Sequence, residues 1–187
     1  MTVGKFDNVV IDGATVYFTS TDITDPKTSL AALQADYLGT AKTSITVMCK
    51  PTIREIEHMG KMGRKNNYDE RITGWEVEAE ADLMDITAKT LGACLLVKDT
   101  TSVPTAHDRY IPAPVIGSSN YKHLVIVGKL QGNGENVVCI VKNTYNSEGL
   151  SIEFKDNDES ASKMKFIGHY ALDSNVAPYE IYIPKTV

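Results

Sequence analysis

Carboxylates recur at every second position of one short segment: Glu76, Glu78, Glu80 and Asp82. Apolar side chains fill the alternate positions, so the segment follows the two-residue period of a β-strand and places its carboxylates on one face. Neighbours on that face lie about 6.6 Å apart, and each neighbouring pair repels by roughly 0.6 kcal/mol in water. Two interpretations stay open, a catalytic carboxylate cluster or the solvated face of a half-buried sheet. In both, the face is expected to meet water.

Sequence motifs for enzymatic chemistry are missing or incomplete. Gly132 and Gly134 lack the third glycine of a dinucleotide-binding fingerprint, and they lie between two predicted strands, as a hairpin turn does. The sequence contains neither a G-x-x-x-x-G-K-[ST] phosphate loop nor a G-x-S-x-G nucleophile elbow. The histidines at positions 58, 107, 123 and 169 form no H-x-x-x-H pair. We therefore expect no enzyme, no cofactor and no metal site.

Composition narrows the class of protein further. The 187 residues include 19 Lys or Arg and 24 Asp or Glu, a formal net charge of −5 that argues against a dedicated nucleic-acid-binding surface. With 42% hydrophobic and 23% charged residues the chain is predicted to be globular, a single domain over residues 1–187. The odd cysteine count, 3, indicates reduced thiols in a cytosolic setting. We expect neither a transmembrane helix nor a signal peptide.

The carboxylate segment needs partner strands, and the rest of the sequence predicts them. Strands are expected at 43–49 with extended character to 56, and at 72–83, 122–130, 136–143, 150–155, 163–172 and 179–183. Within the first, Pro51 indicates a bend, a bulge or a sheet edge. Asp12-Gly13, flanked by apolar β-branched residues, predicts a tight hairpin over 8–19.

The remaining segments predict helix and loops. A flanking α-helix is expected at about 85–97, with Thr87 as its N-cap, and a weaker helical pattern covers 30–38. Residues 57–70, rich in Gly, Asn and charge, predict a long loop that is either functional or disordered. The proline-rich stretch 99–120 predicts a covering loop. The predicted fold is mainly β, an antiparallel β-sandwich or barrel with one flanking α-helix and long loops.

Several of these segments, taken in order, resemble the major tail tube proteins of long-tailed bacteriophages and prophages. The resemblance is carried by Thr52–Glu57 (TIREIE), Glu70–Leu83 (ERITGWEVEAEADL), Ile86–Gly92 (ITAKTLG), Gly168–Asp173 (GHYALD) and Val176–Tyr182 (VAPYEIY). It extends over residues 5–183 and consists of patterned strands in a given order. The stretch 99–120 has no counterpart in the family pattern, which marks it as an insertion or a covering loop.

The resemblance implies a structural virion protein whose hexameric rings stack into the hollow tail tube that delivers phage DNA. It implies that strands 43–56 and 71–83 join neighbouring subunits around the lumen, and that the loop 57–70 reaches the adjacent ring. The lumen-facing residues are then Glu76, Glu78, Glu80 and Asp82. The inter-ring contacts are then Lys61, Arg64, Lys65, Tyr68 and Arg71. For Lys61, Arg64 and Lys65, direct contact with nucleic acid is the alternative role. An acidic wall offers DNA no counter-charge, so DNA slides along it.

The implied partners are other copies of the chain and the tail proteins at the tube ends, without a membrane or a small-molecule substrate. DNA passes through without specific binding. The expected location is the virion tail, assembled in the cytoplasm of the host bacterium. Two alternatives stay open: the inner-tube protein of a contractile or secretion-type injection machine, and a carbohydrate- or surface-binding β-sandwich. The latter expects exposed aromatic residues, for which Tyr170, Tyr179 and Tyr182 are the candidates.

Overall fold

The computed structural model describes residues 10–56, 69–101, 106–131, 134–154, 156, 161–172 and 174–185. The strands within these ranges are β1 (Val10–Thr19), β2 (Tyr37–Glu55), β3 (Glu70–Leu83), β4 (Leu96–Asp99), β5 (Arg109–Pro112), β6 (Lys122–Leu130), β7 (Asn136–Asn146), β8 (Ser151–Glu153), β9 (Ala161–Gly168) and β10 (Tyr179–Tyr182). The helical segments are α1 (Pro26–Ser29), α2 (Ala88–Ala93) and the 3-10 helices η1 (Leu30–Asp36) and η2 (Ser118–Asn120). Among the described residues, none of the helices has the length and apolar character needed to cross a membrane.

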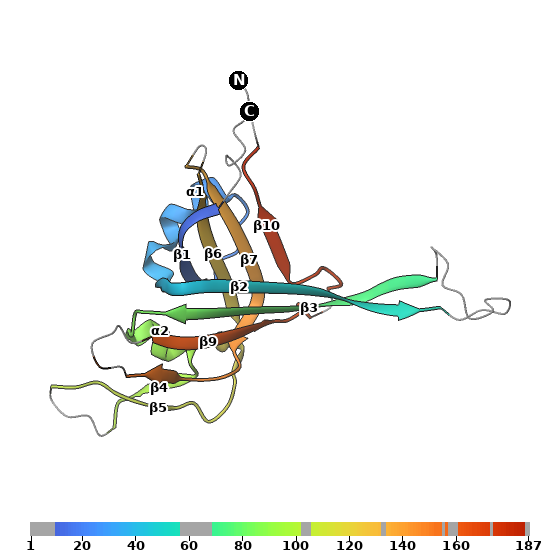
Figure 1. Ribbon diagram of the computed structural model, residues 1–187. Helices are drawn as coiled ribbons and strands as arrows, with labels where there is room; N and C mark the ends of the chain where they lie inside the picture. Colours follow the sequence, from blue (N-terminus) through green and yellow to red (C-terminus); the bar gives the residue numbers. More distant parts are fainter. Residues whose placement is uncertain are drawn as a thin grey trace.

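The main sheet closes on itself. Its strand order is β10-β7-β6-β1-β2-β3-β9-β8, and neighbouring strands are antiparallel. A further antiparallel pairing between β7 and β9 joins β7, β6, β1, β2, β3 and β9 into a closed circuit. Figure 1 shows β2 and β3 crossing in front of β1, β6 and β7, with α2 close to β3 and β9. The mainly β, antiparallel sandwich-or-barrel prediction is confirmed.

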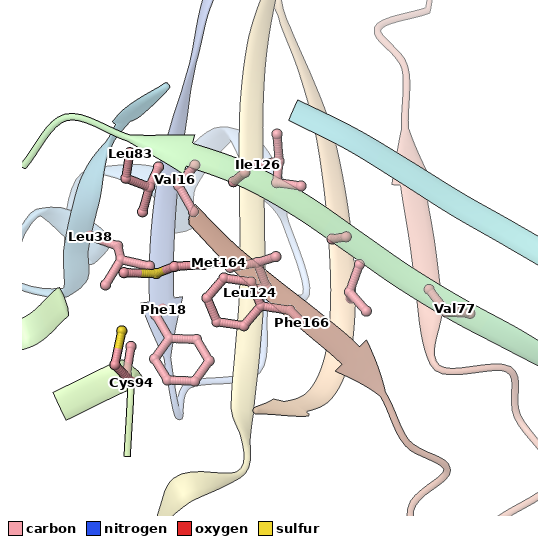
Figure 2. Packing of buried hydrophobic residues seen from close by; sticks show 14 residues of the cluster. Val16, Phe18, Leu38, Val77, Leu83, Cys94, Leu124, Ile126, Met164 and Phe166 are labelled. Atoms are coloured by element: carbon pink, nitrogen blue, oxygen red, sulfur yellow. The ribbon is translucent and has the colours of Figure 1, made fainter. Parts of the chain in front are cut away.

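Apolar side chains fill the interior of this barrel. Phe166, Leu83 and Leu124 are fully buried there, and the rings of Phe18 and Phe166 lie 5.5 Å apart at an angle of 49°. Figure 2 shows side chains from β1, β6 and β9 meeting in this interior, with Met164 beside the two rings. Strands from distant parts of the sequence are thus held together mainly by the burial of apolar surface.

Strands β1 and β6 are buried on both faces, which explains their nearly continuous apolar sequences. Val16 and Leu124 belong to the barrel interior. Their neighbours Tyr17 and Val125 point the other way, into a second cluster that Leu33 of η1 covers. The η1 segment therefore covers the apolar residues of these strands that point away from the barrel interior.

Gly168 lies where the circuit closes, opposite Thr144 in the β7–β9 pairing. A Cβ at this position would stand 2.9 Å from Val141 Cγ1 and 3.3 Å from Val77 Cβ. Since real Cβ contacts are longer than the first of these distances, glycine permits the close approach of β9 to its neighbours.

The hairpin predicted over residues 8–19 is wrong. Val10–Thr19 is one strand, β1, which pairs with β2 on one side and with β6 on the other. The register against β6 shifts between Ile11 and Thr15, so Asp12-Gly13 lies in an irregularity of the ladder. A Gly-containing pair can form a bulge as well as a turn. Here it forms a bulge, because the residues before and after Asp12-Gly13 all pair with the same strand, β6.

Other predicted segments have different bounds. The helix expected at about 85–97 is the shorter α2, because Leu95 adopts a φ of 60° and β4 begins at the next residue. Its N-cap is confirmed, since Thr87 Oγ1 accepts the N–H of Thr90 at 3.3 Å. The helical pattern at 30–38 is the 3-10 helix η1. The stretch 99–120 is not only loop, because β5 pairs there with β4 in a separate two-stranded sheet.

Candidate functional site

Strand β3 has the alternation that its sequence predicts. The buried positions are Val77, Ala79, Ala81 and Leu83, at most 3% exposed. Glu76 and Glu80 are exposed, whereas Glu78 and Asp82 are half-buried on the same side of the strand. Trp75 packs against the barrel core, as expected. The carboxylates therefore share one solvent-facing surface, which we call the charged face.

Strands β2 and β3 continue beyond the barrel as a two-stranded ribbon (Figure 1). β1 pairs with β2 only over Tyr37–Thr40, and β9 pairs with β3 only over Glu78–Leu83. The β2–β3 pairing itself extends to Glu55 and Glu70 at the far end. Within the described part of the chain, β2 beyond residue 41 and β3 before residue 78 thus lack a second strand partner. Such edges present backbone N–H and C=O groups for pairing with another chain.

Pro51 lies on the open edge of β2, which is one of the three alternatives that the sequence left open. It is opposite Trp75 in the register, and the Trp75 N–H donates to the Tyr170 hydroxyl at 2.7 Å, away from β2. The pair is therefore at a non-hydrogen-bonded position, where a proline removes no ladder bond. By the alternation of the ladder, the N–H groups of Val47 and Cys49 also point away from β3.

Aromatic side chains from the C-terminal segment brace the base of the ribbon. Besides the Tyr170 hydroxyl on Trp75 N–H, the Tyr179 ring packs edge-on against the Trp75 ring, with centroids 5.4 Å apart. The Tyr182 hydroxyl donates to Glu180 Oε2 at 2.8 Å. Of the three tyrosines named for a carbohydrate-binding surface, Tyr170 is exposed, whereas Tyr179 and Tyr182 are half-buried.

Lysines lie opposite the carboxylates, a feature that our sequence interpretation missed. The cross-strand pairs are Lys50 with Glu76, Lys165 with Glu80, and Lys163 with Asp82. A signal was present in the sequence, because Lys163 and Lys165 alternate with buried Met164 and Phe166 at the same two-residue period as β3. The register between β3 and β9, however, joins segments about eighty residues apart and follows from the closed barrel rather than from local pattern.

Lys165 is held between two of the carboxylates. Its Nζ lies 2.9 Å from Glu78 Oε2 and 3.3 Å from Glu80 Oε1. Hydrogen bonds to Glu78 and Glu80 raise the pKa of Lys165 above its usual value, so the ammonium stays charged at neutral pH. The Lys165 side chain is only 25% exposed. The charged face is therefore a ladder of both signs and not a bare row of carboxylates.

A shallow hollow of about 180 Å³ lies over this ladder. Its polar lining consists of Ser44, Thr46, Glu80, Asp82, Glu148, Lys163 and Lys165. Among the described residues, no group of three or more His, Cys, Asp or Glu side chains is arranged to hold a metal ion. The hollow thus brings acidic and basic groups of β3, β9 and the β7–β8 connection together at one place.

Of the predicted inter-ring contacts, Arg71 belongs to the described part of the chain. It is exposed on β3, directly opposite Arg54 of β2, and the next pair sets Glu70 opposite Glu55. Like charges at directly opposed positions of two strands repel each other. Residues 57–68, with the other predicted contacts Lys61, Arg64, Lys65 and Tyr68, lie outside the described residues.

A scan against protein-family models found no matching family, and a search of the curated proteins found no match. The geometry of the ribbon and the resemblance in sequence therefore carry the functional interpretation.

Proposed function

We propose that this chain is a structural protein of a phage virion, whose hexameric rings stack into the hollow tail tube that delivers the genome. It assembles in the cytoplasm of the host and acts in the tail. Its partners are copies of itself and the tail proteins at the tube ends, and DNA passes through the lumen without specific binding. The proposal gives the chain no catalytic role and no cofactor.

The ribbon is the observation that supports assembly. Its two open edges, on β2 and β3, belong to antiparallel strands. Pairing of the β3 edge of one copy with the β2 edge of the next continues the same antiparallel alternation, and repetition around a ring removes every exposed edge. The two edges differ, so the contact is heterologous, the kind that closes into rings. The inner tube of a contractile or secretion-type machine would use the same geometry.

In the proposed ring the charged face of β3 looks into the lumen, while its apolar face stays in the subunit core. The lumen-facing set remains Glu76, Glu78, Glu80 and Asp82, now accompanied by the lysines of β2 and β9. DNA is a dense polyanion whose binding to proteins depends on accessible Lys and Arg. Because carboxylates outnumber lysines on this face, the wall offers the passing duplex little attachment.

Electron microscopy of the purified full-length chain tests the assembly. Negative staining at high protein concentration is expected to show rings or tubes with a central hole. A chain that stays monomeric at high concentration, and also when mixed with the tail proteins of the tube ends, would contradict the proposal.

Replacing Glu78→Lys and Glu80→Lys together tests the role of the charged face. We expect tubes to assemble, because both side chains lie outside the barrel core, and DNA delivery to be impaired, because the new cations bind phosphates. Tube formation is scored by microscopy and delivery by infectivity and DNA release. Asp156→Lys, an acidic-to-basic change at an exposed position in the β8–β9 connection, is the control. Unchanged delivery by the double variant would rule out the charged face as the lumen wall.

A further inference from the structure

The charged face contains lysines as well as carboxylates. Whether DNA binds this face depends on how accessible the lysine ammonium groups are to its phosphates. Glu78 and Glu80 stand on the same side of β3, separated by the buried Ala79. β9 runs alongside, with Lys165 directly opposite Glu80. The lysine therefore has one carboxylate directly opposite it on β3 and a second one diagonally opposite, since Glu78 pairs with Ile167.

Both carboxylates contact the ammonium. The distances are 2.9 Å to Glu78 and 3.3 Å to Glu80, and the Lys165 side chain is largely covered. An ammonium has three N–H donors and binds phosphate as a compact point charge. The two carboxylates occupy two of these donors, so a phosphate that reaches the third must approach both negative charges at close range. Lys165 is thus charged but poorly available to DNA.

We propose that Glu78 and Glu80 act as a clamp that keeps the Lys165 ammonium from DNA phosphates, so that this face is inert to DNA through internal ion pairing and not through net negative charge alone. The clamp deepens the proposed function, on which its biological setting rests. It assigns a specific role to two residues of the charged face: Glu78 and Glu80 shield the Lys165 ammonium, which both of them contact.

Lys163 provides a matched comparison for Lys165. It lies two residues earlier on β9, on the same face and opposite Asp82, and it is exposed. If net charge alone governs the face, removal of either lysine has the same effect on DNA binding. If the clamp governs it, the two lysines differ once Glu78 and Glu80 are neutralised.

The experiment measures binding of a short fluorescent DNA duplex to the purified full-length chain by anisotropy, over a series of NaCl concentrations. The proteins are the wild type, the double variant Glu78→Gln/Glu80→Gln, and this double variant combined with either Lys165→Gln or Lys163→Gln. Thermal unfolding first verifies that each variant keeps the wild-type fold. All exchanges are on the solvent-facing side of the strands, so the barrel core is unaltered.

We expect the double variant to bind the duplex several-fold more tightly at low salt, with a steeper salt dependence, by about one counterion for each lysine engaged. Addition of Lys165→Gln should restore the wild-type affinity, whereas Lys163→Gln should restore it much less. Equal restoration by both lysine changes, or no gain in the double variant, overturns the clamp. Because the duplex is bound in solution, this comparison decides the clamp whether or not microscopy finds tubes; absence of tubes counts against the proposed function alone.

Discussion

Burial favours the neutral form of His123 on β6. Its Nδ1 accepts the N–H of Asn143 at 3.3 Å, and its Nε2 lies 3.2 Å from Asp22 Oδ1. Burial lowers the pKa of His123 below its usual value of 6.5, assisted by Lys142 and opposed by the carboxylates of Asp22 and Glu180. A proton on Nδ1 would also face the N–H of Asn143, so protonation breaks a hydrogen bond of the fold.

This environment predicts that the protein loses stability as the pH falls below about 6.5. His123 becomes protonated near pH 6.5 in the unfolded chain, and only at a lower pH in the folded chain. The unfolded state therefore binds more protons between the two values, and the free energy of unfolding decreases as the pH drops through them. Urea unfolding over about pH 5 to 7 measures the decline.

The variant His123→Asn isolates the contribution of the histidine, because it keeps an acceptor near Asn143 but does not titrate. Its unfolding free energy should decline less than that of the wild type over the same range. The same pH dependence in both proteins would show that His123 is not responsible.

At the scale of elements, the ribbon is supported unequally along its length. From Leu83 to Glu78, β3 has β2 on one side and β9 on the other. β9 pairs with β3 no further than Ile167, and Tyr170 then supplies the acceptor for Trp75 N–H in place of a strand. From Gly74 to Glu70 the strand partner of β3 among the described residues is β2.

The variant Tyr170→Phe should loosen the base of the ribbon while the barrel stays intact. It removes one hydrogen bond, which lowers the unfolding free energy by roughly 0.5–1.5 kcal/mol, and it leaves the Trp75 N–H open to exchange. Hydrogen exchange at the Trp75 amide is expected to be faster. Tyr121→Phe is the control, because the Tyr121 ring packs on Tyr145 and His169, whereas the Trp75 N–H donates to Tyr170. Unchanged protection at Trp75 would refute the bracing role of Tyr170.

For the molecule as a whole, the barrel and the ribbon differ in whether the backbone groups at their strand edges are paired. The barrel removes its edges by the β7–β9 pairing, whereas the ribbon leaves its edges for another chain. The stability of the subunit depends on the closed barrel, and the proposed assembly depends on the open edges of the ribbon. Changes at the open edge of β2 should therefore separate assembly from folding.

Proline at neighbouring positions of β2 tests this separation. Pro51 is at a non-hydrogen-bonded position, and backbone N–H groups alternate along the strand. The N–H of Val47 therefore points to the open edge, and the N–H of Thr46 points to β3. Val47→Pro should preserve the β-rich circular dichroism spectrum, with some loss of thermal stability because Val47 packs on the core, and should abolish rings. Thr46→Pro should instead destabilise the subunit itself, since it removes a ladder bond. Rings formed by Val47→Pro at wild-type yield would contradict pairing through this edge.

The parts of the fold that the sequence predicted are those set by local pattern. The alternation of Trp75 to Leu83 follows from one apolar and one wetted face, and Thr87 caps a helix through its own hydroxyl. The bulge at Asp12-Gly13 and the strand β5, which ends at Pro112, were missed because their conformation depends on pairing with distant segments. The carboxylates of the candidate site were found from local pattern, whereas the ion pairs of Lys165 with Glu78 and Glu80 were missed because they depend on the register between β3 and β9.

β3 runs without interruption from the barrel interior into the projecting ribbon. A pull on the far end, directed along the strand, acts parallel to β2 and β9 and loads the flanking hydrogen bonds in shear. Bonds loaded in this way share the force and must rupture together, unlike the successive opening of a zipper. The fully buried Leu83 and Val77 add resistance to sliding, because each must leave its place in the core before the strand can shift. A pull along the ribbon is therefore resisted by many β3 hydrogen bonds at once.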